Sequence, residues 1–204
     1  AEGRSALFLA VSECGESTRL LLEAEADFNR MNTAGLTPII RAIATKKLAP
    51  LRLLIDAGAD VDLFTQGKYP ALCWSILAWS KAEEASKPVC EKIFRLLLAS
   101  GANLDVSGPG GWTSLMLAAK KGVFKAILPL TRGGASVDAG NDLNETALFL
   151  ACESGHESCI SMLLVAGADP DRKGPNDLTC QMIAAKNGHI FAARELIEKR
   201  TTPL

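Results

Sequence analysis

Residues 145–171 read ETALFLACESGHESCISMLLVAGADPD, and this stretch sets the pattern for the rest of the chain. Two short apolar segments lie on either side of Gly155-His156, and the second one stops at residues 166–169, Ala-Gly-Ala-Asp. Apolar segments of this length, broken by Gly and ended by a turn sequence, predict a pair of short helices followed by a turn.

The same pattern recurs along the chain at a nearly constant period. If Thr146 marks its start, the equivalent positions are Ser5, Thr37, Pro70, Thr113 and Thr179. The successive spacings between these markers are 32, 33, 43, 33 and 33 residues. Such self-similarity indicates a repeat architecture. Six tandem units account for the chain, at about residues 2–33, 34–66, 67–109, 110–142, 143–175 and 176–204.

These residues resemble the ankyrin repeat, whose pattern is TPLHxAAxxGH followed by LLxxGADVN. The closest matches are Thr37-Pro38, Gly155-His156, Gly188-His189 and residues 58–62, Gly-Ala-Asp-Val-Asp. The resemblance implies an all-α fold class, an α-solenoid of helix-turn-helix repeats joined by β-hairpin-like loops. We therefore expect one elongated, curved solenoid domain over residues 1–204.

Four units depart from the regular pattern. The third carries about ten extra residues around 80–90, which predicts a longer inner helix or a loop, then a new helix from about Pro88 to Ala99. This insertion is a neutral decoration or a partner contact. In the fourth unit, Pro129 predicts a kink or a late start of the second helix. The last unit resembles a carboxyl-terminal cap with a polar outer face, whereas the first lacks such a face, which predicts a fragment of a larger protein or a missing preceding unit.

The composition argues against several classes of partner. A formal net charge of −1 gives no overall attraction to nucleic acid or to an anionic membrane. Neither a signal peptide nor an apolar run of the about 20 residues that span a bilayer is present.

Two lysine pairs, Lys46-Lys47 and Lys120-Lys121, are interpreted as solvated helix ends or, alternatively, as a phosphate-binding site. Unpaired cysteine spacing predicts reduced, buried thiols and a cytoplasmic or nuclear protein, the residues being Cys14, Cys73, Cys90, Cys152, Cys159 and Cys180.

No sequence motif of a catalytic or cofactor site is present, so we expect no enzyme activity, no cofactor and no metal. The resemblance implies that His156 and His189 tie a helix to a loop; one repeat apart, at about 10 Å, they could not share one metal. The Gly-rich residues 108–111 fit a turn. Family resemblance also makes Asn29 a candidate for hydroxylation, the alternative being an unmodified turn residue.

The resemblance implies a concave binding surface, lined by the hairpin tips and by the exposed side of the inner helices. Tyr69 and Trp112 fall on adjacent tips, and both residue types are enriched at binding hot spots. The alternative for Trp112 is that it folds back over residues 109–111. Trp74 is expected in the core and Trp79 at a helix end. The predicted partner-binding residues are Leu36, Tyr69, Leu77, Trp112, Lys120, Lys121, Glu145 and Glu153.

The function that this layout implies is a non-catalytic module that binds a peptide or protein on its concave surface. We expect it to act as a monomer, without a nucleic-acid partner and without membrane insertion. The alternative is a regulatory or targeting ankyrin domain of a larger enzyme or channel. A small-molecule-binding enzyme is disfavoured because an ankyrin stack has a groove rather than a closed pocket.

Overall fold

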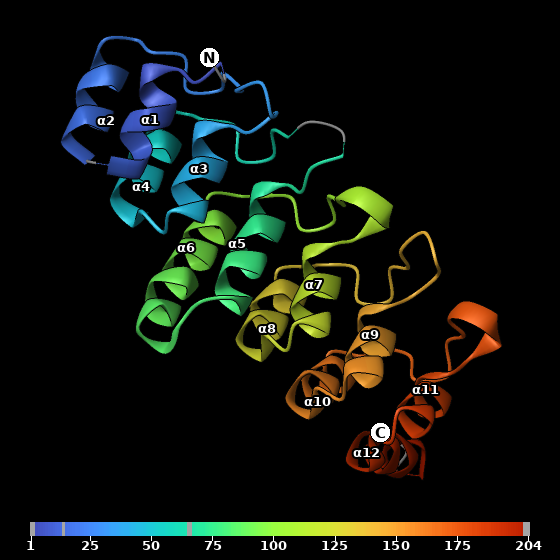
Figure 1. The fold of residues 1–204 in the computed structure, drawn as a ribbon. Coiled ribbons are helices and arrows are strands. Elements are labelled where there is room, and N and C mark those ends of the chain that lie inside the picture. The colour runs from blue at the N-terminus through green and yellow to red at the C-terminus, as the bar shows by residue number, and fades with distance from the viewer. Residues whose placement is uncertain (1–2, 14, 65–66, 202–204) are drawn as a thin grey trace. The chain divides into compact units, whose positions relative to one another are not determined.

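A computed structural model describes residues 3–13, 15–64 and 67–201. Over these ranges the chain is helical, with turns between the helices and no strand, as the sequence predicts (Figure 1). The chain divides into two compact units, Ala1–Pro109 and Gly110–Leu204, and each is described by itself. The helical fold class is thereby confirmed, while a single curved domain over all six repeats stays a prediction.

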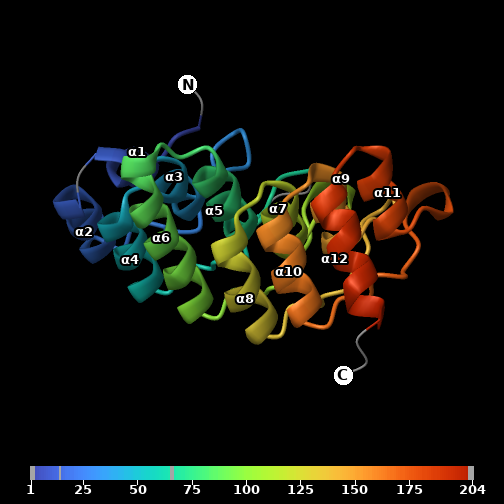
Figure 2. The same cartoon turned by 90° about the horizontal axis from the view of Figure 1, so that it is seen from below.

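Unit 1 contains three helix pairs, each made of an inner helix and an outer helix. The inner helices are α1 (Ala6–Glu13), α3 (Pro38–Ala44) and α5 (Ala71–Ser80); the outer helices are α2 (Gly15–Glu23), α4 (Leu48–Asp56) and α6 (Lys87–Ala99). Each helix packs on its pair mate and on the same helix of the neighbouring pair. The outer helices therefore form one row and the inner helices a second row behind it (Figure 2).

Unit 2 repeats this arrangement three more times. Its inner helices are α7 (Ser114–Lys120), α9 (Ala147–Ser154) and α11 (Cys180–Lys186); its outer helices are α8 (Phe124–Arg132), α10 (Glu157–Val165) and α12 (Ile190–Thr201). Three short 3₁₀ turns, η1 (Glu84–Ser86), η2 (Pro109–Gly111) and η3 (Pro175–Asp177), lie in the connections.

The residue that marks each repeat in the sequence starts its inner helix. The Oγ1 atoms of Thr37, Thr113 and Thr146 accept hydrogen bonds from backbone N–H groups three residues on, at 3.4, 3.3 and 3.2 Å. Ser5 does the same for Phe8 at 3.1 Å. A side-chain acceptor at this position satisfies a helix N–H that has no partner within the helix. The repeat period is therefore a period of helix N-caps.

From α4 onward, the Leu-rich second apolar segment of each repeat places a buried Leu on the outer helix, whereas in α2 the buried residue is Thr18 and Leu20 is 53% exposed. Leu54, Leu97, Leu130 and Leu163 are fully buried at equivalent positions, and Leu196 is 1% exposed. Burying a Leu side chain contributes about 1.5–3 kcal/mol, so one Leu per repeat is a major term in the packing of neighbouring pairs. Small residues at the centre of the inner helices, such as Ala42 and Ala151, are also fully buried and permit close helix approach.

Backbone with positive φ ends the outer helices. Gly58 and Gly167 have φ of 88° and 87°, and Glu25 holds the same place in the first repeat at φ 55°. A residue with a Cβ costs about 1–2 kcal/mol in this region, so Glu25 is a strained substitute for Gly. In the hairpins, Asn144 also has positive φ, at 60°, as its type tolerates.

The structure confirms one expectation about the irregular units and corrects others. The insertion in the third repeat forms residues 81–86 and the longer helix α6, with Pro88 in its first turn as expected. In contrast, α8 starts at Phe124 and continues through Pro129, so a late start was wrong. Pro129 removes only one bond, late in a nine-residue helix, while the buried Ala126, Ile127 and Leu130 hold the helix in place.

Two other expectations about apolar residues also change. Trp79 is the buried tryptophan, 5% exposed, with its ring centroid 5.6 Å from that of Phe94. Trp74 is only half-buried. On the last helix, the exposed residues Ile190 and Phe191 are 70% and 68% accessible, so the face expected to be polar is partly apolar.

Candidate partner-binding surface

In unit 1, the predicted residues Leu36, Tyr69 and Leu77 are all half-buried. Leu36 closes a hairpin in which its carbonyl accepts from Asn32 N at 3.0 Å, and its N–H donates to Asn32 Oδ1 at 2.9 Å. The Tyr69 ring lies against Gly108, where an added Cβ would be 2.2 Å from the ring. Burial, with a smaller contribution from Cys73, raises the pKa of the Tyr69 hydroxyl. Each of the three residues thus keeps an exposed part.

In unit 2, Trp112 lies over its own turn. Its Cδ1 atom is 3.2 Å from the place where a Cβ on Gly110 would stand, and Gly110 has φ of 73°. This is the fold-back arrangement that the sequence left open for Trp112. The ring is nevertheless half-exposed, so it keeps surface that another molecule can contact.

The charged residues predicted for unit 2 are partly satisfied within the unit. Lys120 on α7 forms an ion pair with Glu153 on the neighbouring α9, with side-chain exposures of 33% and 31%. Glu145 accepts a hydrogen bond from Asn141 Nδ2 at 2.7 Å. Lys121, which follows α7, is exposed. The structure therefore brings Lys120 and Glu153 together, and these two offer less free charge than the sequence suggested.

The structure identifies Leu143, at a hairpin tip of unit 2, as an exposed apolar residue that sequence reasoning missed. Leu143 is 65% exposed. Asn141 fixes the tip, because its Oδ1 accepts from the N–H groups of Leu143 and Glu145 at 3.0 and 2.9 Å. The signal available in the sequence was the Asn-x-Leu-Asn turn, since Asn favours such side-chain to backbone bonds.

The two histidines tie successive repeats together, as the resemblance implied. His156 Nε2 is 3.2 Å from the carbonyl oxygen of Lys120, and His189 Nε2 is 3.1 Å from that of Glu153. Because a carbonyl only accepts, Nε2 carries the hydrogen in both rings. Each ring also lies over the glycine that ends the preceding inner helix, Gly122 for His156 and Gly155 for His189.

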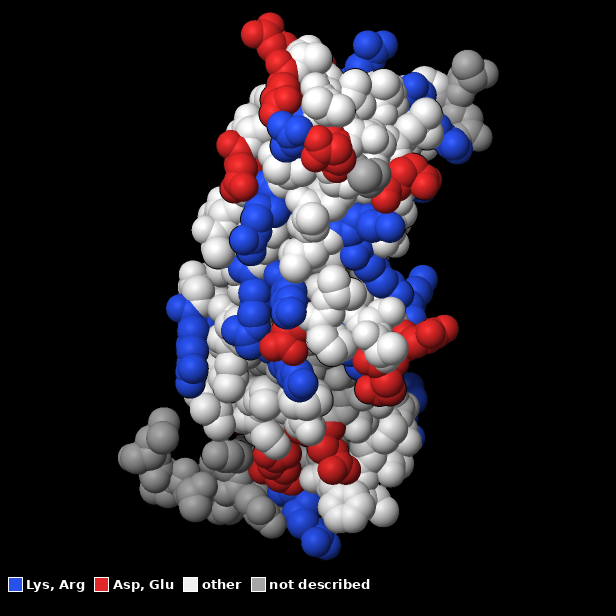
Figure 3. All heavy atoms as spheres, turned by 90° about the vertical axis from the view of Figure 1, so that its left-hand side faces the viewer, with Lys and Arg blue, Asp and Glu red and all other residues white. Residues whose placement is uncertain are grey.

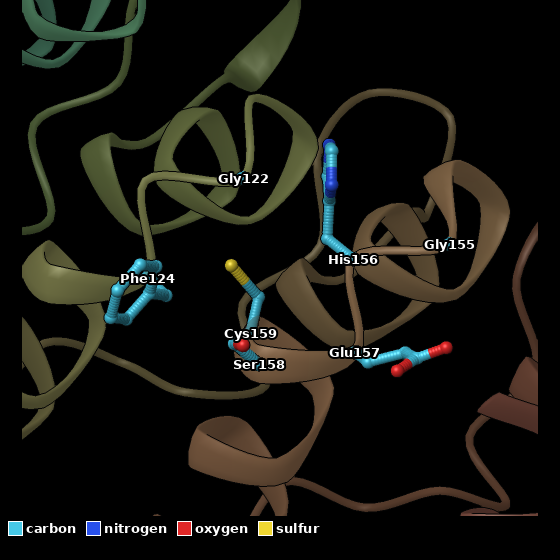
Figure 4. A pocket seen from close by; sticks show the side chains of 7 residues that line it. All are labelled: Gly122, Phe124, Gly155, His156, Glu157, Ser158 and Cys159. Carbon is cyan, nitrogen blue, oxygen red and sulfur yellow. The ribbon is translucent and has the colours of Figure 1, made fainter. Parts of the chain in front are cut away.

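An open depression of about 230 Å³ lies beside His156, between the helix connections of the fourth and fifth repeats (Figure 4). Figure 4 shows the Phe124 ring on one side and the Cys159 thiol between that ring and His156. Burial raises the pKa of Cys159 to about 12, and its side chain is 1% exposed. A protonated, buried thiol is a poor nucleophile, so Cys159 is a packed side chain rather than an activated group.

The described cysteines are buried free thiols: Cys73, Cys90, Cys152, Cys159 and Cys180. Cys14 lies outside the described residues. Burial raises the pKa of Cys73 to about 12. A hydrogen bond with Cys180, followed by burial, raises the pKa of Cys152. Thiols of this kind act as small core side chains.

Asn29, the candidate for hydroxylation, is part of the turn structure. Its Oδ1 accepts from Asp60 N in the next repeat at 3.0 Å, and its own N–H donates to Asp27 Oδ1 at 2.9 Å. The Asn29 side chain thus joins two successive turns of unit 1.

The described residues hold neither a metal-binding cluster nor a membrane-spanning helix. In residues 3–13, 15–64 and 67–201, no group of three His, Cys, Asp or Glu side chains is placed to hold a metal ion. In the same ranges no helix is both long and apolar enough to cross a bilayer.

On the outer-helix side of unit 1, acidic side chains gather near α2 and basic ones near α4 and α6 (Figure 3).

Comparison with known proteins agrees with this architecture. A family model of ankyrin repeats (3 copies) matches residues 84–174. Among solved structures, an ankyrin repeat domain from Acinetobacter baumannii AYE is similar, with a TM-score of 0.83 and 24% sequence identity. The similarity covers 95% of this chain and 97% of that domain, and at this identity it shows the fold. No curated protein matches the sequence.

Proposed function

Because residues 84–174 are ankyrin repeats and the chain has the ankyrin repeat fold over nearly its whole length, we propose that it is a non-catalytic module that binds another protein or a peptide. Ankyrin repeats are in general protein-interaction modules. In this proposal each unit binds through its inner-helix face, which consists of the hairpin tips and the exposed side of the inner helices.

The observation that carries the proposal is a set of large side chains on this face that the core does not bury. In unit 1 they are Leu36, Tyr69 and Leu77, all half-buried. In unit 2 they are the half-buried Trp112 and the exposed Leu143. Lys120, Lys121, Glu145 and Glu153 add a polar rim in unit 2, in the manner of interfaces whose apolar anchors are surrounded by polar residues.

The proposed location is the cytoplasm or the nucleus, and the proposed active form is a monomer. The five buried free thiols support a reducing compartment. The formal net charge of −1 supports a protein rather than a nucleic-acid partner, since it provides no general attraction to phosphates.

The proposal is tested by crosslinking in a lysate, with mass spectrometry of the captured proteins. Wild type is compared with the double variant Tyr69→Ala/Trp112→Ala and with Val165→Ala. Val165 is a fair control because it is apolar and 72% exposed, but lies on the outer helix α10. We expect a protein that wild type and Val165→Ala both capture and that the double variant loses. Equal capture by all three folded proteins would refute the assignment of this face.

A further inference from the structure

The guanidinium of Arg41, on the inner helix α3 of unit 1, is held between neutral groups. Its Cζ lies 5.8 Å from the centroid of the Phe8 ring, and its Nη2 donates to Ser12 Oγ at the long distance of 3.4 Å. Phe8 and Ser12 belong to the preceding inner helix α1. Arg41 itself is half-buried, so part of the guanidinium still reaches the surface.

Arg41 has no carboxylate partner among the described residues. The ion pairs formed by the described side chains do not include Arg41. Its Nε is buried and makes no hydrogen bond to the described part of the chain. Charged groups that are withdrawn from water are normally paired and hydrogen-bonded, because desolvation is otherwise costly. A half-buried guanidinium without a carboxylate partner is therefore unusual, and an acceptor from another molecule would complete its hydrogen bonding.

A second donor without an acceptor lies at the equivalent position of the next repeat. Trp74 is four residues after its repeat marker, as Arg41 is, and the helices α5 and α3 that carry them pack together. The indole Nε1 of Trp74 is buried and makes no hydrogen bond to a described residue. Two adjacent inner helices thus each carry a buried donor that has no hydrogen-bond acceptor among the described residues.

We propose that Arg41 anchors a binding site on the inner-helix face of unit 1, and that this site binds a carboxylate of a partner protein or peptide. Nε is shielded, so the carboxylate approaches the exposed edge that carries the two Nη groups. A guanidinium binds a carboxylate through two parallel hydrogen bonds, which gives both strength and a fixed orientation. The indole of Trp74, on the neighbouring inner helix α5, is a second N–H group from which binding can be followed.

A carboxylate fits this site better than a phosphate does. The Phe8 ring and the Ser12 hydroxyl, which lie against the Arg41 guanidinium, bring no second positive charge. A single guanidinium balances a single negative charge, whereas phosphate sites usually gather several donors and cations. Leu36, Tyr69 and Leu77 belong to the same unit and the same proposed face. The partner is thus an acidic residue among apolar neighbours.

The class of partner rests on the proposed function, but the site can be tested by itself. The full chain is labelled with ¹⁵N, and the Nε–H signal of Arg41 and the indole N–H signal of Trp74 are followed by NMR. The probe is acetyl-glutamate amide, and its isosteric control is acetyl-glutamine amide. We expect the carboxylate probe to shift both signals saturably and to bind about tenfold tighter than the neutral control, as for a charged hydrogen bond. Inorganic phosphate should bind more weakly than the carboxylate.

Variants assign the effect to the guanidinium. Arg41→Gln should abolish the response of Trp74 to the carboxylate, and Arg41→Lys should weaken it while keeping the charge. Arg52→Gln, an exposed cation on the outer helix α4, should leave the response unchanged. Chemical-shift dispersion and circular dichroism show whether each variant is folded. If Arg41→Gln does not fold, the response of Arg41→Lys decides the test.

The inference is overturned if neither signal responds, if the glutamine control or phosphate binds as tightly, or if folded Arg41→Gln and Arg41→Lys respond like wild type. Its failure can be told apart from failure of the proposed function. A captured partner that binds Arg41→Gln as tightly as wild type keeps the interaction module and removes the carboxylate site. Saturable binding of the probe without any captured partner keeps the carboxylate site and removes the interaction module.

Discussion

The contact between His189 and Gly155 predicts a measurable coupling between the fifth and sixth repeats. Gly155 has φ of 70°, and a Cβ placed there would lie 2.5 Å from His189 Nδ1. Gly167, which ends the outer helix of the same repeat, has φ of 87° but nothing within 4 Å of such a Cβ. The substitutions Gly155→Ala and Gly167→Ala therefore impose a similar backbone cost, and only the first displaces a ring.

The magnitudes follow from these two geometries. A Cβ at positive φ costs about 1–2 kcal/mol, so Gly167→Ala should lower the free energy of unfolding by this amount. In Gly155→Ala the ring must also move by roughly 1 Å to reach van der Waals separation. This movement breaks the 3.1 Å bond from His189 Nε2 to the Glu153 carbonyl and costs about 1 kcal/mol more. The expected total for Gly155→Ala is about 2–3 kcal/mol.

Urea unfolding, with the slope m checked for each variant, measures these values. The double-mutant cycle with His189→Ala isolates the ring, because Gly155→Ala in that background should cost no more than Gly167→Ala does. Equal costs of the two glycine substitutions, or additive effects in the cycle, would refute the role assigned to the histidine ring.

Three further predictions concern helix ends and the buried thiols. Thr146→Ala should lower the unfolding free energy by about 1 kcal/mol, because it removes the N-cap acceptor of α9, while Thr146→Ser should lose far less. Glu25→Gly should raise stability by about 0.5–1 kcal/mol, since relief at φ 55° exceeds the entropy cost of Gly; an unchanged midpoint in urea would contradict this. The pKa values of Cys73 and Cys159 are raised from 9 to about 12 in the folded chain, so the stability they confer is complete below pH 9 and is lost as the pH rises toward 12. The decline should be about 1.4 kcal/mol per pH unit per thiol, and Cys73→Ala should reduce that slope between pH 9 and 11 in an unfolding series.

The repeat fold was predictable because its determinants are local and recur along the chain. Thr at the marker position caps an inner helix, the Leu-rich run buries one stripe, and a residue with positive φ ends the outer helix. Each signal alone is weak, but a fixed period combines them. The longer helix α6 was also predictable, because Pro88 is favourable in a first turn and not later.

Details that depend on neighbouring repeats were less predictable. Pro129 is tolerated because buried neighbours in α8 outweigh one lost hydrogen bond, and no local rule shows that balance. Trp79 packs against Phe94 at the end of α5, as expected, whereas Trp74, which was expected in the core, is only half-buried. Lys120 was predicted as a free charge but pairs with Glu153, a contact between residues 33 positions apart.

The candidate surface was predicted from the layout that the family resemblance implies, and the structure refines its members. Leu143 was missed because the predicted tip residues, Tyr69 and Trp112, directly precede a repeat marker, whereas Leu143 lies three residues before its marker Thr146, where Asn141 turns the chain. Arg41 was missed because a lone Arg in a helix has no distinguishing pattern; its significance comes from the absence of a carboxylate among the described side chains around it.

The central claim, that the inner-helix face binds a partner protein, is tested most directly by the dissociation constant of a captured partner. It should be measured by calorimetry for wild type, Tyr69→Ala/Trp112→Ala and Val165→Ala. Truncating hot-spot aromatics costs about 2 kcal/mol or more, so the double variant should bind about 30-fold more weakly or worse, and Val165→Ala should match wild type. Unchanged affinity of the folded double variant, or an equal loss in Val165→Ala, would contradict the account.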